Sequence, residues 1–324
     1  MSGRACSPGH TSVPESTTGR KGSRRHEEVV SLIWLSSRWK LLVMLVPTIA
    51  FFTVFVVYPV GFSLYYSFTN FIGFGPAAWV GGANYLTLFT NPLFWVSLRN
   101  TAVILVLSVV VLIPLSFLLA TLMRRNFRGA GILRALVFAP GIIAPILVGL
   151  IWVFILDPQF GLVDALLKDA GVAHPPEWIG GNTLGPISVA IVFIWSTIGF
   201  AMTIFYAGLQ LLPGDVLEAS ALDGAGGFKQ IWNITVPMLR ETFAITTVLV
   251  ITNVFKIFEL VYQLTGGGPV HKSETLVSYM YFITFTSQQY GPGMAFAVII
   301  TVLGALVSVG YLFLLRNRDS ETSR

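Results

Sequence analysis

The chain has 324 residues, of which 54% are hydrophobic and only 11% are charged. Soluble globular domains carry about 25% charged residues, so this composition excludes an ordinary soluble protein and predicts a polytopic membrane protein. The formal net charge of +5 does not indicate nucleic-acid binding. The basic residues lie mostly at the ends of apolar segments, where they are typical of membrane topology signals.

The chain begins with a polar segment, residues 1–28, whose richness in Ser, Gly, Pro, Thr, Arg and His predicts a disordered tail. Residues 29–40 can form a short interfacial helix, since Trp34 and Trp39 stand beside basic residues, as headgroup-level anchors do. We therefore expect residues 1–40 to form a basic cytoplasmic tail. Cys6 is the only cysteine, so it can form no internal disulfide and is interpreted as a free thiol.

Six apolar segments follow, and each is near the length of about 20 residues needed to span the hydrocarbon core. They are predicted at about 41–66, 98–122, 133–156, 187–211, 241–264 and 293–315. The first has a basic flank like that of a signal peptide, but it lacks a small-residue cleavage site and is too long, which favours an uncleaved span. The sequence thus predicts an all-α membrane protein with six transmembrane helices in a domain at 41–315, followed by a cytoplasmic tail at 316–324.

The distribution of Lys and Arg predicts the orientation of these spans. With the N-terminus placed in the cytoplasm, sixteen of the twenty Lys and Arg residues fall in cytoplasmic segments, three fall in outer segments and one, Lys256, falls within a span. This asymmetry predicts that both termini are cytoplasmic. It also places the loop 212–240 in the cytoplasm and the loops 67–97, 157–186 and 265–292 outside, where they can meet a soluble partner.

No constellation of residues indicates covalent chemistry or metal binding. The four histidines are far apart in sequence, and the chain has no P-loop, no Ser/His/Asp set and no Cys/His cluster. A membrane-embedded enzyme would need clustered acids or metal ligands, whereas the outer acids Asp157, Asp164, Asp169 and Glu177 are scattered and are interpreted as a solvated loop face. An ion-coupled secondary transporter would need an ion-coupling carboxylate or broken helices at matching positions in two halves. The sequence indicates neither, and it predicts no catalytic residue and no metal ligand.

The loop 212–240 is expected to contain a first short helix at about 216–222. Asp215 suits its N-cap, and Asp215-x-x-Glu218 has the spacing of a capping box. Small residues would let a partner approach this helix closely; they are Ala219, Ser220 and Ala221.

The second half of the loop is expected to turn and form another short helix. Asp223-Gly224 would end the first helix, and residues 228–236 would form the second. Pro237 would then occupy the first turn of the next span, where its missing N–H costs little. These local features are equally compatible with a plain helix–turn–helix in which Glu218 only caps a helix.

The spacing of residues in this loop resembles the EAA loop of ABC-importer permeases. The matching stretch is Glu218-Ala219-Ser220, three residues, Gly224, nine residues, and Ile234-Thr235-Val236-Pro237. Ser220 and Val236 replace the usual Ala and Leu with residues of similar size, and Asp223-Gly224-Ala225 matches a tripeptide common in sugar importers. In that family the loop docks into the ATP-binding subunit and moves as a rigid lever. The resemblance implies this role for Asp215, Glu218, Ala219, Ser220, Asp223, Gly224, Ala225, Ile234 and Pro237.

A second stretch narrows the resemblance to sugar and glycerol-phosphate importers. Residues 255–269 (FKIFELVYQLTGGGP) resemble their pattern F-x-x-F-D-x-I-Y-x-L-T-G-G-G-P, with Glu259 in place of Asp. Tyr58-Pro59, Asn84-Tyr85 and Arg99-Asn100-Thr101 are also in the style of that family. From residue 41 to 315 the chain is similar to the MalF-like or UgpA-like permease subunits of the binding-protein-dependent sugar transport family, which have the ABC type I importer (MetI-like) bundle.

This resemblance implies a transport function without chemistry on the chain itself. The chain would form half of the path for a sugar or oligosaccharide in a bacterial inner membrane. It would pair with a homologous second permease subunit, two ATP-binding subunits and an extracytoplasmic solute-binding protein. It would bind no cofactor, since ATP and Mg would sit on the ATP-binding subunits. A glycerol-phosphate-type or other solute, and an ion-coupled secondary transporter, remain the alternatives.

Two intramembrane charges are candidates for the substrate path. Lys256 and Glu259 are three residues apart, which would put them on one face of a helix, and charges within spans usually face a bundle interior or an aqueous cavity. With Asn253 and Tyr262 they would line the path; alternatively they form a self-neutralising structural pair or extend towards the outer leaflet. Four aromatic residues are weaker candidates for stacking on a sugar: Trp195, Phe200, Tyr206 and Phe258. The outer-loop residues singled out by the resemblance are Gly266, Gly267, Gly268 and Pro269.

Overall fold

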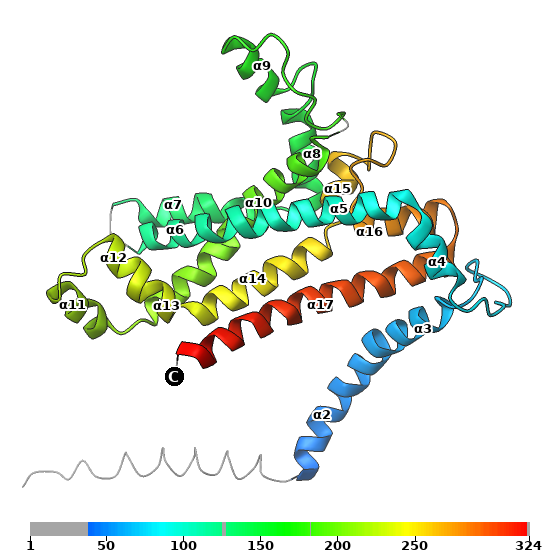
Figure 1. The fold of residues 1–324 in the computed structure, drawn as a ribbon, viewed down its shortest axis with the longest axis horizontal. Helices are drawn as coiled ribbons and strands as arrows, with labels where there is room; N and C mark the ends of the chain where they lie inside the picture. Colours follow the sequence, from blue (N-terminus) through cyan, green and yellow to red (C-terminus); the bar gives the residue numbers. More distant parts are fainter. Residues whose placement is uncertain (1–37, 125–127, 182, 323–324) are drawn as a thin grey trace, which may run out of the picture. The chain divides into compact units, whose positions relative to one another are not determined.

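The structure of the protein is a computed structural model that describes residues 38–124, 128–181 and 183–322. Within these ranges all regular secondary structure is helical, apart from one isolated bridge between Thr69 and Trp79, which confirms the predicted all-α class (Figure 1). Most of the predicted tail 1–40, including Cys6, lies outside the described residues. The chain divides into two compact units, Met1–Phe62 and Ser63–Arg324.

The first unit contains a long apolar helix. Its elements are α2 (Arg38–Phe52), η1 (Thr53–Val57) and the first part of α3 (Tyr58–Tyr66). The described residues from Leu42 to Gly61 are all exposed, and the apolar stretch Leu42–Tyr66 has 25 residues, enough to cross a membrane. A helix that is apolar all round and packs on nothing in its own unit requires a surrounding of lipid or of other apolar helices.

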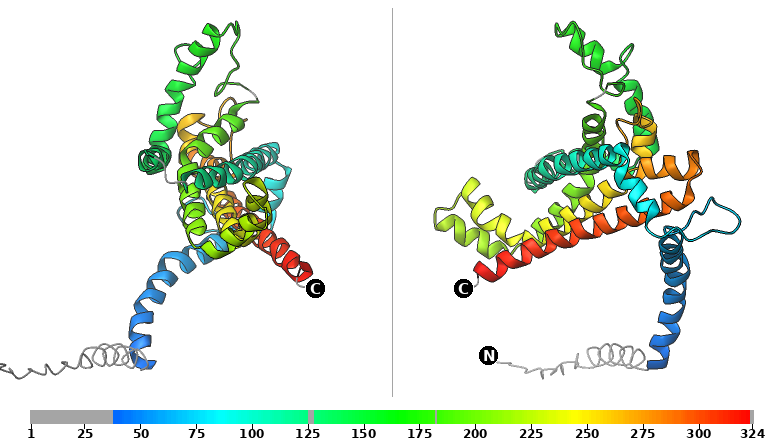
Figure 2. Two further views of the ribbon diagram at one scale, coloured as in Figure 1. Left: turned by 90° about the vertical axis from the view of Figure 1, so that its left-hand side faces the viewer. Right: turned by 45° about the vertical axis from the view of Figure 1, so that its right-hand side comes forward.

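The second unit contains the other helices, which Figure 2 shows from two further sides. In chain order they are α4 (Ala83–Thr90), α5 (Pro92–Leu107), η2 (Ser108–Leu112), α6 (Ile113–Met123), α7 (Ala130–Phe138), η3 (Ala139–Ile142), α8 (Pro145–Ile155), α9 (Leu162–Asp169), α10 (Gly185–Gln210), α11 (Gly214–Leu222), α12 (Phe228–Gln230), η4 (Ile231–Thr235), α13 (Val236–Met238), α14 (Arg240–Phe255), α15 (Glu259–Leu264), α16 (Leu276–Tyr281), η5 (Phe282–Thr286) and α17 (Tyr290–Thr322).

Four continuous helical stretches of the described chain are long and apolar enough to cross a membrane. They are Leu42–Tyr66, Pro92–Met123, Gly185–Gln210 and Tyr290–Leu314. Two further pairs pass the same test although each is bent: Ala130–Ile142 with Pro145–Ile155 by 100°, and Phe228–Met238 with Arg240–Phe255 by 71°. Counting each bent pair as one span gives up to six spans, in agreement with the six predicted apolar segments.

Two predicted spans are wrong as continuous helices. The segment 133–156 breaks at Ile143–Ala144, because Pro140 and Pro145 lack the N–H groups that a continuous helix would use there. The segment 241–264 breaks after Phe255, and α15 begins only at Glu259. The carbonyl of Ile257 in this second break accepts a hydrogen bond from Thr275 Oγ1 at 3.1 Å, which replaces a lost helical partner.

Three π-helical turns precede prolines at a constant distance. The turns η1, η2 and η4 each end two residues before a proline, and these prolines are Pro59, Pro114 and Pro237. A proline ring collides with the carbonyl four residues earlier, which in each case lies inside the π turn. Widening that turn relieves the collision and lets the helix continue. These three prolines therefore do not end the helices that contain them, unlike Pro140 and Pro145.

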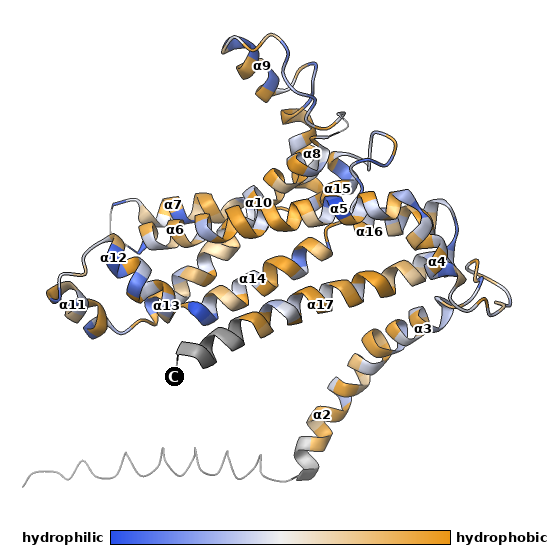
Figure 3. Cartoon of the chain, viewed as in Figure 1, coloured by the Kyte–Doolittle hydropathy of each residue, from blue (hydrophilic) through white to orange (hydrophobic). Residues whose placement is uncertain are grey.

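Helix α10 is the centre of packing in the second unit, where it contacts α5, α6, α7 and α14. Its buried residues Val189, Phe193 and Phe205 belong to an apolar core that also includes residues of α6, α8 and α15. A second core joins α5, α14, α16 and α17 through Phe94, Phe255 and neighbouring side chains. Figure 3 shows α5, α10, α14 and α17 as largely apolar, with polar residues gathered around α9 and α12, as expected for a membrane bundle.

Candidate functional site

The predicted coupling loop lies at one end of the second unit. Figure 1 shows α11 and α12 beyond the end of α6 and the beginning of α7, on the same side as the start of α14 and the described end of α17. The α4 and α16 helices lie at the opposite end. The loops of this unit that the charge count assigned to the cytoplasm are thus gathered together.

Helix α11 begins at Gly214, with Pro213 as its N-cap residue and without a side-chain cap. The predicted N-cap role of Asp215 and its capping box with Glu218 are therefore wrong. Pro213 starts the helix earlier because it holds the extended conformation (φ −59°, ψ 126°) from which Gly214 enters the first turn. Asp215 falls within that first turn, where its negative charge interacts favourably with the helix dipole. Both Asp215 and Glu218 are exposed and available to a partner.

The end of α11 is closed by a glycine turn, as predicted. Gly224 has a left-handed backbone (φ +82°), and its N–H donates to the carbonyl of Ala221 at 3.2 Å. The N–H of Ala225 donates to the carbonyl of Ser220 at 2.9 Å. These two bonds make a Schellman motif, which satisfies the last carbonyls of the helix and needs a residue that tolerates positive φ.

A side-chain bridge that the sequence did not indicate joins α11 to α12. Gln230 Nε2 donates to the carbonyl of Leu217 at 2.7 Å and to Ser220 Oγ at 2.8 Å. Ser220 is consequently buried within the loop, which corrects the prediction that it belongs to a surface for a partner. Ala219 and Ala221 remain exposed as predicted. The bridge sets the angle between the two short helices.

The second half of the loop bends before the next long helix. Pro237 lies in α13, upstream of the 71° bend at Leu239, and α14 begins at Arg240. The predicted place of Pro237 in the first turn of the span is therefore wrong, because the π turn η4 carries the helix through the proline. Phe228 and Trp232 are exposed, and their ring centroids are 6.0 Å apart. Exposed aromatic side chains at a loop end are typical of a protein-docking surface.

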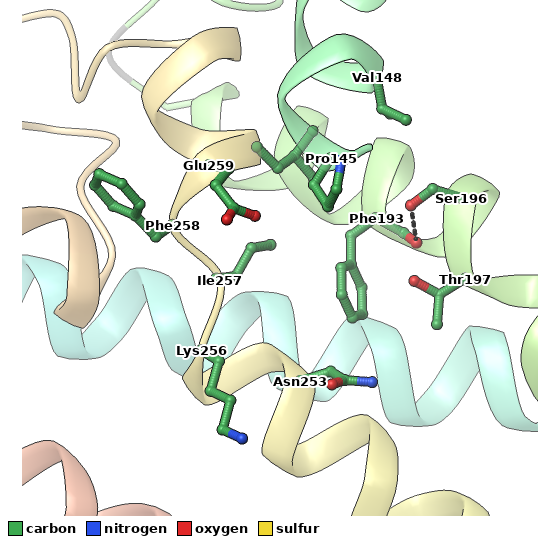
Figure 4. A pocket seen from close by; sticks show the side chains of 11 residues that line it. Pro145, Val148, Phe193, Ser196, Thr197, Asn253, Lys256, Ile257, Phe258 and Glu259 are labelled. Atoms are coloured by element: carbon green, nitrogen blue, oxygen red, sulfur yellow. Dashed lines mark hydrogen bonds between the residues drawn. The ribbon is translucent and has the colours of Figure 1, made fainter. Parts of the chain in front are cut away.

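A cavity lies where the two broken helices meet α10 (Figure 4). Its volume is about 320 Å³, and a neighbouring cavity of about 330 Å³ shares part of its wall. The lining common to both is Pro145, Val148, Ser196, Thr197 and Asn253. Non-helical backbone inside a membrane bundle is tolerated where it is buried in protein or lines a water-filled cavity, so the two breaks make this cavity a candidate solute site.

The structure brings Asn253, Lys256 and Glu259 to this cavity, but in a different arrangement from the predicted one. Lys256 is the C-cap of α14 and Glu259 is the first residue of α15, so the break between them destroys the predicted common helix face. In Figure 4 Lys256 points away from Glu259. No ion pair joins them among the described side chains, which contradicts the self-neutralising pair. Lys256 also lines a groove between α14 and α17.

Only some of the other predicted path residues line a cavity. Tyr262 does not line either cavity; it is 52% exposed and its ring packs on Phe258 and Tyr281 with centroid distances of 5.5 and 5.8 Å. Phe258 lines the first cavity and Phe200 the second. The hydroxyls of Ser196 and Thr197 were missed, because nothing in a uniformly apolar span singles out two small polar residues.

The outer Gly-rich loop is attached to α5 by hydrogen bonds. Asn100 Nδ2 donates to the carbonyls of Lys272 and Glu274 at 2.7 and 2.9 Å. Gly267 (φ +76°) lies directly against the buried Glu274 carboxylate and leaves no room for a Cβ. His271 Nδ1 lies 3.0 Å from the same carboxylate. These contacts hold the loop in one conformation, in which Val270 is 82% exposed.

Comparison with known proteins decides the family of the chain. Residues 112–319 match the family described as "Binding-protein-dependent transport system inner membrane component". The chain belongs to this family. It is accordingly a multi-pass inner-membrane permease component of an ABC transporter; ATP hydrolysis belongs to other subunits, and the family binds no cofactor of its own.

Relatives of this permease serve different solutes. It is 33% identical to the sn-glycerol-3-phosphate transport system permease protein UgpA of Brucella abortus over 80% of this chain and 89% of that protein. It is 29% identical to AmyD of Thermoanaerobacterium thermosulfurigenes, described as a probable permease protein of a transport system for starch degradation products, over 85% and 93%. A bacterial alginate ABC transporter, solved in complex with an alginate pentasaccharide-bound periplasmic protein, has a chain of the same fold (TM-score 0.75, 22% identity, 86% and 94% covered).

The broken helices correct one argument made from the sequence. The permease has two interrupted spans, so the expected absence of broken helices was wrong as a ground against an ion-coupled transporter. Family membership, rather than helix continuity, identifies the permease. Among the residues that the structure describes, no group of three or more His, Cys, Asp or Glu is placed to hold a metal ion.

Proposed function

We propose that this permease subunit imports a sugar or oligosaccharide. The observation that carries the proposal is the cavity between the two broken helices, where hydroxyl, amide and carboxylate groups stand among aromatic and aliphatic side chains. Sugars present both hydroxyls and apolar C–H faces, so their sites combine such groups. The relative AmyD, named for starch degradation products, supports this class of solute.

A glycerol-phosphate-type solute is the second candidate, and the relative UgpA favours it. A phosphate is held by several cationic or N–H donors. Among the described residues, Lys256 is the only basic one that lines either cavity. The lining therefore suits a neutral solute better than a phosphorylated one.

The chain contributes half of the path and one coupling loop to a larger assembly. Residues 41–315 form the permease domain, between tails at 1–40 and 316–324. A homologous second permease subunit completes the path, and an ATP-binding subunit receives the loop through Asp215, Glu218 and Ala219. When two ATP-binding subunits close on ATP, the loop moves and the bundle changes from inward-facing to outward-facing. Asn253, Lys256 and Glu259 line the path, with Tyr262 at its margin.

Both termini are cytoplasmic in this proposal, and the outer Gly-rich loop faces the extracytoplasmic solute-binding protein. The distribution of Lys and Arg supports this orientation. The gathering of the loop 212–240 and the α6–α7 connection at one end of the second unit agrees with it. The rigid loop from Gly266 to Pro269 would present Val270 to the binding protein.

Purification of the tagged chain in mild detergent tests the assembly. A second permease and an ATP-binding subunit are expected to co-purify. Recovery of the chain alone, even after cross-linking within residues 215–236, would contradict the proposal. Uptake of maltose, maltotriose and glycerol 3-phosphate by vesicles containing the assembly and its binding protein then distinguishes the solute classes. Transport of glycerol 3-phosphate alone would overturn the sugar assignment.

Substitutions separate coupling from solute binding in the same vesicles. Glu218→Ala is expected to abolish ATP-driven uptake while the chain still inserts into the membrane. Asn253→Ala and Glu259→Gln are expected to reduce uptake while the ATP-binding subunit remains bound. Glu177→Ala, at an exposed acid of an outer loop, is the control. Normal uptake by the Glu218 variant would refute the coupling role of the loop.

A further inference from the structure

Arg134 in α7 contacts two other helices at the end of the unit that carries the coupling loop. Its Nη2 donates to the carbonyl of Met123, the last residue of α6, at 2.8 Å. Its guanidinium carbon lies 4.2 Å from the centroid of the Tyr206 ring in α10. The first contact satisfies a terminal carbonyl that has no partner within its own helix. The second is a cation–π contact, which the flat guanidinium makes better than an ammonium does. One side chain thus joins α6, α7 and α10.

The Nε of Arg134 is buried and has no hydrogen-bond partner in the described part of the chain. A buried donor without a partner lowers stability, so this arrangement is not the one that stability alone would favour. A lysine could cap α6 without burying such a donor. The unpaired Nε is therefore an observation, independent of the two contacts, that favours a functional use of the guanidinium.

Helices α7 and α10 touch again nearer to the cavity. A Cβ on Gly199 would lie 2.3 Å from the carbonyl oxygen of Val137, and a Cβ on Gly141 would lie 3.1 Å from the carbonyl oxygen of Ser196. Gly199 is seven residues before Tyr206, about 10.5 Å or two turns along the same face of α10. The segment α7–η3 therefore contacts α10 at three levels: through the Arg134 side chain at Tyr206, through the backbone of α7 at Gly199, and through the backbone of η3 at Ser196.

These contacts form a continuous connection between the coupling loop and the cavity. Helix α10 ends at Gln210, and α11 of the coupling loop begins at Gly214. Helix α7 leads through η3 to Pro145, which lines the cavity. Any displacement of the loop that moves α10 can reach the cavity wall through α7, provided that α7 stays attached.

We propose that Arg134 is a positioning residue that makes α6, α7 and α10 move as one body, so that movement of the coupling loop changes the shape of the cavity. The proposal rests on the proposed function, since it needs a loop that is moved by an ATP-binding subunit. Without the guanidinium, α10 moves with the loop while α7 lags behind. The assembly then hydrolyses ATP with less solute transported for each ATP.

The test measures solute uptake and ATP hydrolysis on the same reconstituted assembly with its binding protein, using the sugar that the wild-type assembly transports. Arg134→Gln removes both contacts, Arg134→Lys keeps the charge without the planar group, and Tyr206→Leu removes the ring. Tyr206→Phe keeps the ring and Arg124→Gln changes an exposed arginine at the end of α6, so both serve as controls.

The first three variants are expected to lower the ratio of uptake to hydrolysis by roughly fivefold or more. The amount of co-purified ATP-binding subunit should not change, and both controls should keep the wild-type ratio. A wild-type ratio in Arg134→Lys and Tyr206→Leu would overturn the proposal. So would a parallel fall of uptake and hydrolysis with loss of the ATP-binding subunit, since that outcome indicates a purely structural role. If the wild-type assembly itself shows no ATP-dependent uptake, the proposed function fails instead.

Discussion

Replacement of Gly199 by alanine is expected to separate α7 from α10 and to destabilise the permease. The new Cβ would lie 2.3 Å from the carbonyl oxygen of Val137 and 2.6 Å from the Cα of Phe138. Ordinary van der Waals contact begins at 3.4 Å, so the two helices must move apart by about 1 Å. Both contacting atoms are backbone atoms, and no change of rotamer can relieve the overlap.

The magnitude follows from two opposing terms. Overpacking costs typically about 1–3 kcal/mol, and contact with rigid backbone places this case near the upper value. Alanine in place of glycine within a helix returns about 1 kcal/mol. The expected net loss in the free energy of unfolding is about 2 kcal/mol, which corresponds to a fall in Tm of roughly 4–8 °C.

Thermal unfolding of the purified permease in mild detergent, followed by tryptophan fluorescence, measures this effect. Gly131→Ala is the matched control, because Gly131 is in the same α7 helix and a Cβ there meets nothing within 4 Å. This control is expected to keep or slightly raise Tm. An unchanged Tm for Gly199→Ala, or equal shifts for the two variants, would refute the close backbone packing from which the loss was calculated.

Three further substitutions have measurable consequences. Gly224→Ala should weaken the turn after α11 by about 1 kcal/mol and reduce ATP-driven uptake. Gly226→Ala should do neither, because Gly226 does not have a positive φ and is surrounded by open space. Equal uptake by the two variants would contradict the turn assignment. Gln230→Ala should free α11 from α12 at a cost of about 1 kcal/mol and lower the amount of co-purified ATP-binding subunit, and unchanged co-purification would show that the bridge is dispensable. Asn100→Leu should lower Tm, because the buried carbonyl of Glu274 loses its donor at about 1–3 kcal/mol and the partly buried carbonyl of Lys272 loses its donor as well. Leu at the exposed neighbour Arg99 should leave Tm unchanged.

The spans and the coupling loop could be predicted from local properties of the sequence. The thickness of the hydrocarbon core sets the length of an apolar run, so each predicted segment overlaps a helical stretch or a bent pair, although the last residues of the segment 241–264 lie beyond the pair that ends at Phe255. The turn after α11 was predictable because its left-handed backbone conformation favours glycine, and Gly224 stands at that position. The start of α11 was not, since Pro213 and Asp215 each suit a helix start and only the three-dimensional path of the chain decides between them.

The breaks that form the cavity depend on contacts distant in sequence. Residues 256–258 contain no proline or glycine, and the helix can stop there because Thr275, eighteen residues later, supplies a donor to the Ile257 carbonyl. The pattern of apolar residues within the span gives no information about a donor so far away in the sequence. For the same reason the sequence placed Lys256 and Glu259 on one face, which assumes a helix that continues between them.

The π turn before Pro114 has a consequence for how this permease tolerates changes in length. The buried positions of this span advance by four residues from Ile104 to Ser108 and to Leu112, where the next residue Ile113 is buried as well, and then continue to Ser116 and Ala120. The π turn takes up one residue more than a regular α-helical turn, so both Leu112 and Ile113 lie on the buried face. In a regular α-helix one additional residue would rotate everything beyond it by about 100°. A homologous chain that lacks both the proline and one residue here would bury the same side chains on both sides of the turn. Insertion or loss of a single residue at such a turn therefore changes one local hydrogen-bond pattern and leaves the faces of the bundle aligned.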